Sequence, residues 1–414
     1  MQHTPCEPLV RKTLTTSCLI LLGLALGACG GAGGPGGSRA EAVFEQTLAA
    51  DPQYASYAIT IAADSRSAAA RRHVIDLIRS DHYPTALEAV RAYQDDPIEE
   101  AREALAAVFA EKSGALQLQA AVALARLGDE DAAVWLEEQI AGGAAALNLP
   151  ALQVASERGK VDLVRDALRG PITSESLVTR NEVYAILGTL RQPWATDLLL
   201  QGLDNERGEE RQQAILALGR AGEPRAAERI TRFINTQGLV FATLESLGAM
   251  GNPDTLRVAR SMTRHEEPLV RLYAAVATWR LGGAEDARPV LEPMVGVDDA
   301  TLRQVLAEQL ATLDAPEARE WLATLCRDSE KAVRIAALRS LAEGATAADA
   351  EVFLEAAGDP DYEIATLGLN VLARVGSAEM ADAIAGGLES DNPYVALSTA
   401  HAMLALRESG AAGS

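Results

Sequence analysis

The stretch Arg211–Gly222, written RQQAILALGRAG, decides how this chain folds. Related versions return as LQAAVALARLG from Leu118, as VRLYAAVATWRLGG from Val270 and as VRIAALRSLAEGA from Val333. In each version, apolar residues recur at helical spacing behind a polar residue, and a glycine or a short polar turn ends the unit. One such helix cannot bury its apolar stripe alone, so neighbouring copies must stack on one another.

The copies end at nearly even intervals along the chain. We call the residue at the turn that ends each copy its ruler position. Successive ruler positions lie roughly 29 to 32 residues apart, and most intervals are about 31. The ruler positions are Arg66, Pro97, Gly128, Gly159, Arg191, Gly222, Gly251, Gly282, Asp314, Ala345, Gly376 and Arg407. A second apolar helix is readable between most of them, for example over 226–234, 317–325 and 347–356. The sequence therefore predicts an all-α fold, a right-handed superhelical α-solenoid of about twelve helix pairs.

Two positions of the repeat predict the seam between neighbouring units. The residue eight places before each ruler position is usually small, and a leucine recurs four places before it. The first set is Ala58, Ala89, Ala120, Ala151, Val183, Ala214, Thr243, Ala274, Leu306, Ala337, Gly368 and Thr399. The second set is Leu124, Leu187, Leu218, Leu247, Leu310, Leu341 and Leu372. Both positions share one helical face, so small residues would let helices approach while leucines fill the space between them.

The amino-terminal segment does not belong to the array. Arg11 and Lys12 precede the uncharged run CLILLGLAL, and Leu26-Gly27-Ala28-Cys29 follows that run. A basic segment, a short apolar core and small residues before a cleavage position are typical of a secretory signal. The alternative is a retained membrane anchor. The run 18–28 is too short for it, because a spanning helix needs about 20 residues.

Residues 26–29 resemble the lipobox of bacterial lipoproteins, in which a branched apolar residue and two small residues precede an acylated cysteine. The resemblance implies a signal peptide over 1–28, a lipid on Cys29 and a glycine-rich tether over 29–38. Gly30 stands where lipoproteins kept in the inner membrane often carry aspartate. The resemblance therefore implies a lipid-anchored protein of the cell envelope, at the outer membrane and facing the periplasm. The array is expected over 39–407, with a flexible tail over 408–414.

The repeats resemble HEAT repeats, particularly the short variety named after phycobilisome lyases. An acidic turn, Val-Arg and an alanine- and leucine-rich helix carry the resemblance, which is weak in the first two units and at Ala365 and Ala396, where arginine is replaced. The matching arginines are Arg180, Arg211, Arg271, Arg303 and Arg334. The resemblance implies that they form a ladder with turn carboxylates between units. The alternative is a basic strip that recruits an acidic partner. End units are expected to be atypical because one face of each meets solvent.

The sequence contains no recognised catalytic or metal-binding motif. The histidines beyond the leader, His73, His82, His265 and His401, form no pair at the spacing of a helical metal site. Deoxyhypusine hydroxylase uses similar repeats, but the iron site of that family needs several His-Glu pairs, and only His265-Glu266 occurs here. Bilin lyases also share the repeat but act in the cytosol. Cys326 is expected to be a small buried residue. We therefore expect no cofactor, no metal and no enzymatic activity.

The charge of the chain indicates which partners it can bind. A formal net charge of −21 disfavours nucleic acid, because phosphate groups are repelled. In HEAT-type arrays the motif-bearing helix lines the concave side. The candidate contacts there are Arg220, Glu245, Tyr273, Arg280, Glu308, Arg339, Asn370 and His401. Their alternating charges favour a protein or peptide partner in the cell envelope. Two alternatives stay open: an envelope enzyme or lyase-like protein with an unrecognised site, and a purely structural spacer.

Overall fold

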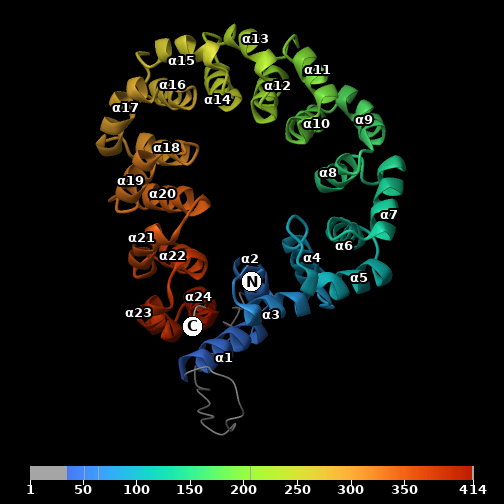
Figure 1. The fold of residues 1–414 in the computed structure, drawn as a ribbon, viewed down its shortest axis with the longest axis vertical. Coiled ribbons are helices and arrows are strands. Elements are labelled where there is room, and N and C mark those ends of the chain that lie inside the picture. Colours follow the sequence, from blue (N-terminus) through green and yellow to red (C-terminus); the bar gives the residue numbers. More distant parts are fainter. Residues whose placement is uncertain (1–34, 51, 64, 206, 413–414) are drawn as a thin grey trace, which may run out of the picture.

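The protein forms a ring of paired helices, described in a computed structural model for residues 35–412 except residues 51, 64 and 206 (Figure 1). Within these residues the regular elements are 24 α-helices and eight short 3-10 helices. The helices alternate between an inner and an outer layer around the ring (Figure 1). The predicted all-α solenoid of about twelve helix pairs is therefore confirmed. The predicted signal peptide, Cys29 and residues 29–34 of the predicted tether lie outside the described residues.

The even-numbered helices form the inner layer (Figure 1). They are α2 (Pro52–Ala62), α4 (Tyr83–Ala92), α6 (Ala115–Arg126), α8 (Leu149–Glu157), α10 (Leu177–Leu190), α12 (Gly208–Ala221), α14 (Val240–Met250), α16 (Pro268–Arg280), α18 (Ala300–Leu310), α20 (Lys331–Glu343), α22 (Tyr362–Val375) and α24 (Pro393–Ala412). The repeated motif lies on this layer, because RQQAILALGRAG falls on α12 and its relatives fall on α6, α16 and α20. The prediction that motif-bearing helices line the concave side is confirmed.

The odd-numbered helices form the outer layer. They are α1 (Pro35–Ala50), α3 (Ala68–Ile78), α5 (Arg102–Glu111), α7 (Glu130–Ala141), α9 (Val161–Arg169), α11 (Pro193–Gly202), α13 (Ala227–Thr231), α15 (Leu256–Met262), α17 (Ala284–Leu291), α19 (Pro316–Leu325), α21 (Ala350–Ala357) and α23 (Ala381–Ile384). The 3-10 helices adjoin outer helices and are η1 (Glu99–Ala101), η2 (Pro171–Thr173), η3 (Pro224–Ala226), η4 (Pro253–Thr255), η5 (Glu292–Gly296), η6 (Ala347–Asp349), η7 (Ala378–Met380) and η8 (Ala385–Glu389). None of the described helices is both long and apolar enough to cross a membrane.

Local chemistry explains where the helices begin and end. The Asp129 carboxylate accepts a hydrogen bond from the backbone N–H of Ala132 at 2.9 Å and so caps the start of α7. Gly222 closes α12 in the left-handed region at φ 66°, which glycine adopts without a steric penalty. Arg191 takes the same left-handed position after α10 at φ 50°. Both are ruler positions of the repeat, so the ruler marks helix ends there, whereas the last ruler position, Arg407, lies inside α24.

The predicted seam positions lie in the core between the packed helices of the array. All members of the small-residue set and of the leucine set are buried. The backbones of α10 and α12 come so close that a Cβ built on Gly188 would lie 2.7 Å from the carbonyl oxygen of Ala217. The predicted small residue Ala214 faces the outer layer instead, since a Cβ built on Gly202 of α11 would lie 2.8 Å from its Cβ. Close approach in both directions buries the apolar stripe of each helix.

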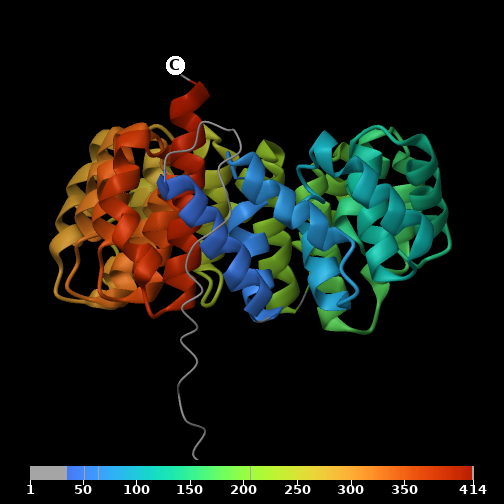
Figure 2. The ribbon, with the colours of Figure 1, turned by 90° about the horizontal axis from the view of Figure 1, so that it is seen from below.

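The two ends of the array meet, which the sequence did not lead us to expect. Helix α24 packs against α1, α2 and α3 (Figures 1 and 2). Here this contact is called the closure. Leu397, Ala400, Met403 and Leu406 on α24 are all buried, although they cover more than one side of the helix. The prediction of solvated end faces is wrong, because the two end units bury those faces against each other.

The boundaries of the array also differ from those predicted. Helix α1 begins at Pro35, so residues 35–38 of the predicted tether are helical, and proline is favourable at the first position of a helix. Helix α24 continues to Ala412, so the predicted tail from residue 408 begins inside a helix. Glu408 contributes to the closure, because its carboxylate accepts hydrogen bonds from Ser67 Oγ and the Ala68 N–H, each at 2.8 Å.

Candidate functional site

Arginines near the start of several inner helices bind the turns that precede those helices. Each of the five predicted ladder arginines donates to the backbone carbonyl six residues before it. The pairs are Arg180 with Ser174, Arg211 with Asn205, Arg271 with His265, Arg303 with Val297, and Arg334 with Asp328. Arg71 makes the same contact with the carbonyl of Ser65, but it lies on the outer helix α3. The five ladder arginines thus fix the turns that lead into α10, α12, α16, α18 and α20.

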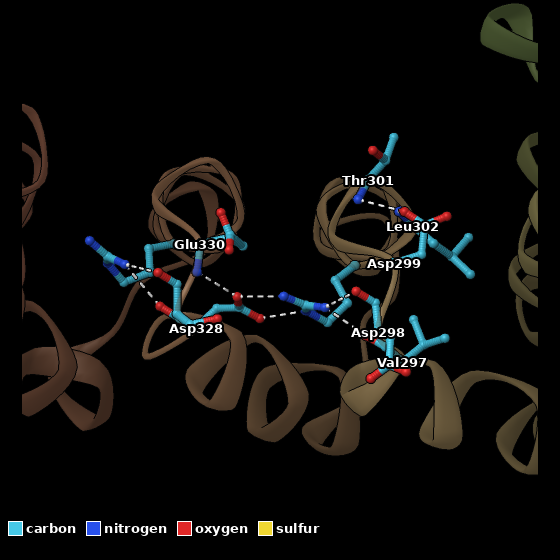
Figure 3. A network of polar contacts seen from close by, with 10 residues as sticks. Val297, Asp298, Asp299, Thr301, Leu302, Asp328 and Glu330 are labelled. Atoms are coloured by element: carbon cyan, nitrogen blue, oxygen red, sulfur yellow. Dashed lines mark hydrogen bonds and ion pairs between the residues drawn. The ribbon is translucent and has the colours of Figure 1, made fainter.

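Asp328 links two of these arginines (Figure 3). Its carboxylate accepts from Arg303 Nε at 2.6 Å and Nη2 at 2.8 Å, while its backbone carbonyl accepts from Arg334 Nη1 at 2.9 Å. The hydrogen bonds from Arg303 lower the pKa of the Asp328 carboxyl, although burial acts in the opposite direction. Asp328 therefore stays ionised and couples one unit to the next.

The other arginines contact neighbouring units unequally. Arg180 pairs with Glu210 at 2.7 Å, and both side chains are buried. Arg334 lies 3.6 Å from a carboxylate oxygen of Asp359. Arg211 instead lies over the ring of Phe233, 5.2 Å from its centroid, and the contacts of Arg271 are carbonyl bonds. Burial and internal partners leave Arg180 and Arg303 little capacity to bind an acidic partner.

Four of the predicted contact residues interact on the inner face of α14, α16 and α18. Tyr273 packs against Phe241 with ring centroids 5.1 Å apart. Burial raises the pKa of the Tyr273 hydroxyl, and the charges of Glu245 and Glu308 raise it further. Burial lowers the pKa of Arg280, while Glu245 acts against this shift. The structure therefore brings these residues into one electrostatic group, with Tyr273 near two carboxylates.

A hollow of about 510 Å³ lies between α18 and α20 on the inner face. We call it the inner hollow and define it by Gln304, Glu308, Ala332, Ile335, Arg339 and Glu343, which are among its lining residues. Glu308 accepts a hydrogen bond from Gln304 at 3.1 Å. Arg339 is exposed and makes no ion pair within the described residues. The two predicted contacts Glu308 and Arg339 thus line the same accessible space.

A second hollow of about 390 Å³ adjoins the first where the ends of the chain meet. We call it the closure pocket and define it by Tyr57, Arg339, Tyr362, Leu367, Asn370 and Tyr394, which are among its lining residues. The rings of Tyr57 and Tyr394 meet edge to face, with centroids 5.0 Å apart, and Tyr362 stacks beside Tyr394 at 6.4 Å. Ile335 and Arg339 line both hollows, so the two hollows are parts of one continuous surface.

The remaining predicted contacts take different positions. Arg220 is exposed at the end of α12 and lines neither hollow. Asn370 lines the closure pocket and donates Nδ2 to the Tyr57 hydroxyl at 3.1 Å. His401 is 1% exposed, and its Nε2 lies 2.7 Å from Ser65 Oγ. His401 as a partner contact is therefore a wrong prediction, because the closure covers the face of α24 that an open array would expose.

Sequence reasoning missed the tyrosines of the closure pocket. Tyr57, Tyr362 and Tyr394 lie in terminal units, as does Tyr54, whose ring meets that of Tyr394 at 5.5 Å. Half of the eight tyrosines in the chain therefore gather at its two ends. This unequal distribution was a readable signal. It indicates that the atypical composition of the end units serves a contact rather than solvation.

Within the described residues, Cys326 and the histidines do not form a recognisable chemical centre. Cys326 is buried, as predicted, and burial raises the pKa of its thiol to about 12. His265 accepts a hydrogen bond from the backbone N–H of Glu267 within the turn before α16. Across the described part of the chain, no group of three or more His, Cys, Asp or Glu residues is placed to hold a metal ion.

Comparison with known proteins agrees with this architecture. A family model described as HEAT repeats matches residues 298–369, which include α18, α20 and the Asp328 contacts. No curated protein matches the chain. The paired helices and this match together define a HEAT-like α-solenoid, a fold that suggests a scaffold or protein-interaction role.

Solved structures with related folds share little sequence with this chain. The complex of CpcE and CpcF of phycocyanin lyase from a Nostoc species is 16% identical, covers 72% of this chain and 92% of its own, and gives a TM-score of 0.35. An engineered protein is 15% identical over 81% and 98% of the two chains, with a TM-score of 0.31. Human deoxyhypusine hydroxylase in complex with glycerol is 15% identical over 59% and 96%, with a TM-score of 0.30.

Proposed function

We propose that this protein is a lipid-anchored scaffold of the cell envelope that binds a protein or peptide along the inner face of its ring. The observation that carries the proposal is the continuous surface formed by the inner hollow and the closure pocket. Its walls are partly apolar, and Glu308 and Arg339 offer isolated charges that can orient a bound segment. The net charge of −21 makes a polypeptide a better partner than a nucleic acid.

Site-specific photocrosslinking in living cells tests the binding face. A photoreactive residue replaces Ala332, which is exposed on α20 and lines the inner hollow. The matched control carries the same residue at Glu320, which is exposed on the neighbouring outer helix α19. We expect protein adducts from position 332 and few from position 320. The opposite pattern would move the binding site to the outer face.

Charge reversal gives a second test of the same face. Arg339→Glu removes an unpaired positive charge from both hollows and should reduce the adducts formed at position 332. Arg257→Glu on the outer helix α15 is the control, because Arg257 is also exposed and makes no ion pair within the described residues. Equal loss in both variants would indicate a non-specific charge effect and argue against this face.

The membrane anchor rests on the sequence Leu26-Gly27-Ala28-Cys29. If Cys29 is acylated, the wild-type protein takes up a labelled fatty acid and the Cys29→Ala variant does not. Equal labelling of the two proteins would exclude the anchor. The lipid would hold the ring at a membrane surface, where a scaffold can retain its partner.

A further inference from the structure

The closure pocket is built from residues of both ends of the chain. Tyr57 comes from α2 in the first units, whereas Arg339, Asn370 and Tyr394 come from α20, α22 and α24 in the last units. These two groups are far apart in sequence and meet only through the closure. The pocket is therefore complete only while the ring is closed.

Contacts with the last units hold Tyr57 in place. Its hydroxyl lies 2.6 Å from Ser398 Oγ and accepts a hydrogen bond from Asn370 Nδ2 at 3.1 Å. Its ring meets that of Tyr394 at an interplanar angle of 89°, a favourable edge-to-face arrangement. An opened ring would lose these contacts and one wall of the pocket together.

The pocket combines an apolar aromatic lining with an unpaired positive charge. Tyr57, Tyr362 and Tyr394 supply aromatic surface, and Tyr362 is 48% exposed. The carboxylate of Glu363, which also lines the pocket, pairs with Lys331 at 2.5 Å, and Lys331 also pairs with Asp361 at 2.7 Å. Arg339 makes no ion pair within the described residues, so its positive charge is free to pair with a ligand. This combination is complementary to a carboxylate beside a large apolar group.

We propose that the closure pocket binds an extended peptide segment that carries an acidic residue beside a large apolar residue, and that this binding holds the ring closed. The peptide carboxylate pairs with Arg339, and the apolar side chain packs among the tyrosines. Because Arg339 also lines the inner hollow, the segment continues from the pocket toward α18. The inference rests on the proposed function and adds the chemistry of the partner and its effect on the ring.

The coupling follows from binding linkage. A ligand that contacts both Tyr57 and Arg339 binds the closed ring and has no complete site on an opened one. It therefore shifts the equilibrium toward the closed form by its difference in affinity for the two forms. Closure in turn raises the affinity for the peptide.

Defined synthetic peptides test the chemistry. The probes are acetylated hexapeptides of glycine and serine that contain Asp-Phe, Asn-Phe, Lys-Phe or Asp-Gly at the two central positions, each with a fluorophore. Binding to the full acylated protein in detergent is followed by fluorescence anisotropy. We expect the Asp-Phe peptide to bind at least about tenfold more tightly than the Lys-Phe peptide, which corresponds to about 1.4 kcal/mol. Equal binding of these two peptides, or stronger binding of the Lys-Phe peptide, would overturn the proposal.

Variants of the pocket separate this inference from the proposed function. Tyr57→Ala should weaken Asp-Phe binding about tenfold, whereas Tyr83→Ala, at a tyrosine that is 51% exposed on α4, should not. Tyr57→Phe keeps the ring contact and should bind more tightly than Tyr57→Ala, which excludes a folding defect as the cause. If Tyr57→Ala has no effect while position 332 still forms adducts, the closure pocket is wrong and the inner-face function stands. Absence of adducts at position 332 in the protein with an intact closure pocket would instead refute the function itself.

Hydrogen exchange tests the effect on the ring. Saturating Asp-Phe peptide should slow amide exchange at least about threefold in 54–62 and 393–408, the segments of α2 and α24 at the closure. Exchange in α12 is the internal reference and should not change. Unchanged exchange at the closure in the presence of bound peptide would overturn the coupling.

Discussion

The ordinary seams are the contacts between neighbouring inner helices around the ring. They differ from the closure in the side chains that form the contact. Between α10 and α12, the contact is formed by Gly188 and Ala217, whose backbones nearly touch. At the closure, hydroxyl groups, an imidazole and a carboxylate bridge the two ends, as in Ser65 with His401 and Ser67 with Glu408. The ordinary seam combines close backbone packing with ion pairs near the helix starts, such as Arg180 with Glu210, whereas the closure lacks a repeated backbone contact and uses hydroxyl, imidazole and carboxylate groups.

This difference indicates where the ring can open. Separating an ordinary seam exposes apolar surface that water does not stabilise. Separating the closure also exposes apolar residues such as Leu397 and Met403, but water replaces many of its hydrogen bonds, so the net loss for each bond is modest, about 1 kcal/mol. The ring should therefore open at the closure before it loosens elsewhere, and acid and mutation should affect the two regions separately.

The largest effect is expected from overpacking the ordinary core of the ring, where Ala214 faces Gly202 of the outer helix α11. Ala214 on α12 is fully buried, so Ala214→Phe should destabilise the protein by about 3 kcal/mol. Urea unfolding gives the magnitude, and hydrogen exchange should rise mainly in α10, α11 and α12. Gln212→Phe, at a half-buried position on the same helix, should cost much less. A uniform rise in exchange around the whole ring would show that the seams are not independent.

Acid should open the closure through His401. Burial lowers the pKa of His401 to about 4, and its Nδ1 has no hydrogen-bond partner. An exposed His401 in the opened state takes up a proton near pH 6.5, whereas the closed state does not until about pH 4. Stability is therefore lost as the pH falls from 6.5 to 4, and the loss at pH 5 is about 2 kcal/mol.

The measurement is hydrogen exchange in α2 and α24 at pH 7 and pH 5, corrected for the intrinsic effect of pH on exchange rates. His401→Gln should remove the additional loss of protection at pH 5, because glutamine does not titrate there and can still bond Ser65 Oγ. Equal pH dependence in the wild type and in His401→Gln would show that another group controls the closure.

The sequence predicted the seams but not the closure, for a physical reason. A seam is repeated with every unit, so residues such as Ala214 and Leu218 recur at a fixed interval. The closure occurs once, between residues as distant as Ser65 and His401, and leaves no period. Helix α24 did carry a signal, since its run HAMLAL is apolar around much of the helix, which is typical of a helix buried on several sides.

The same difference between repeated contacts and single contacts explains which residues of the candidate site the sequence predicted and which it did not. Glu308 and Arg339 could be placed on the inner face because helix geometry alone sets their direction. Tyr57 could not be assigned to the site, because it reaches Tyr394 only through the closure. His401 was misplaced on the exposed face for that reason too. Local periodicity therefore predicted the part of the surface formed by consecutive units and missed the part formed by distant ones.

A smaller effect is expected where a polar contact supports an ordinary seam. Asp328→Asn removes a carboxylate that accepts two hydrogen bonds from Arg303 and should cost about 1.5 kcal/mol at pH 7. The folded pKa of Asp328 is lowered, so the stability it contributes is present above about pH 4 and is lost as the pH falls further. The difference between variant and wild type should persist at pH 5 and vanish in stronger acid. Asp359→Asn, whose contact with Arg334 is 3.6 Å, is the matched control and should cost less.

The smallest effect is expected at the carboxyl-terminal edge of the closure. Glu408 places its carboxylate at the start of α3, where it accepts from Ser67 Oγ and the Ala68 N–H and faces the positive end of the helix dipole. Glu408→Gln keeps one acceptor but removes the charge, so it should cost about 0.7 kcal/mol. Exchange at the first amides of α3 and in α24 should accelerate about threefold, and exchange in α12 should not. The control, Glu379→Gln at an exposed position of η7, should change neither. Acceleration in α12 equal to that in α3 would mean that the ring opens as one unit, and the distinction between the closure and the ordinary seams would fail.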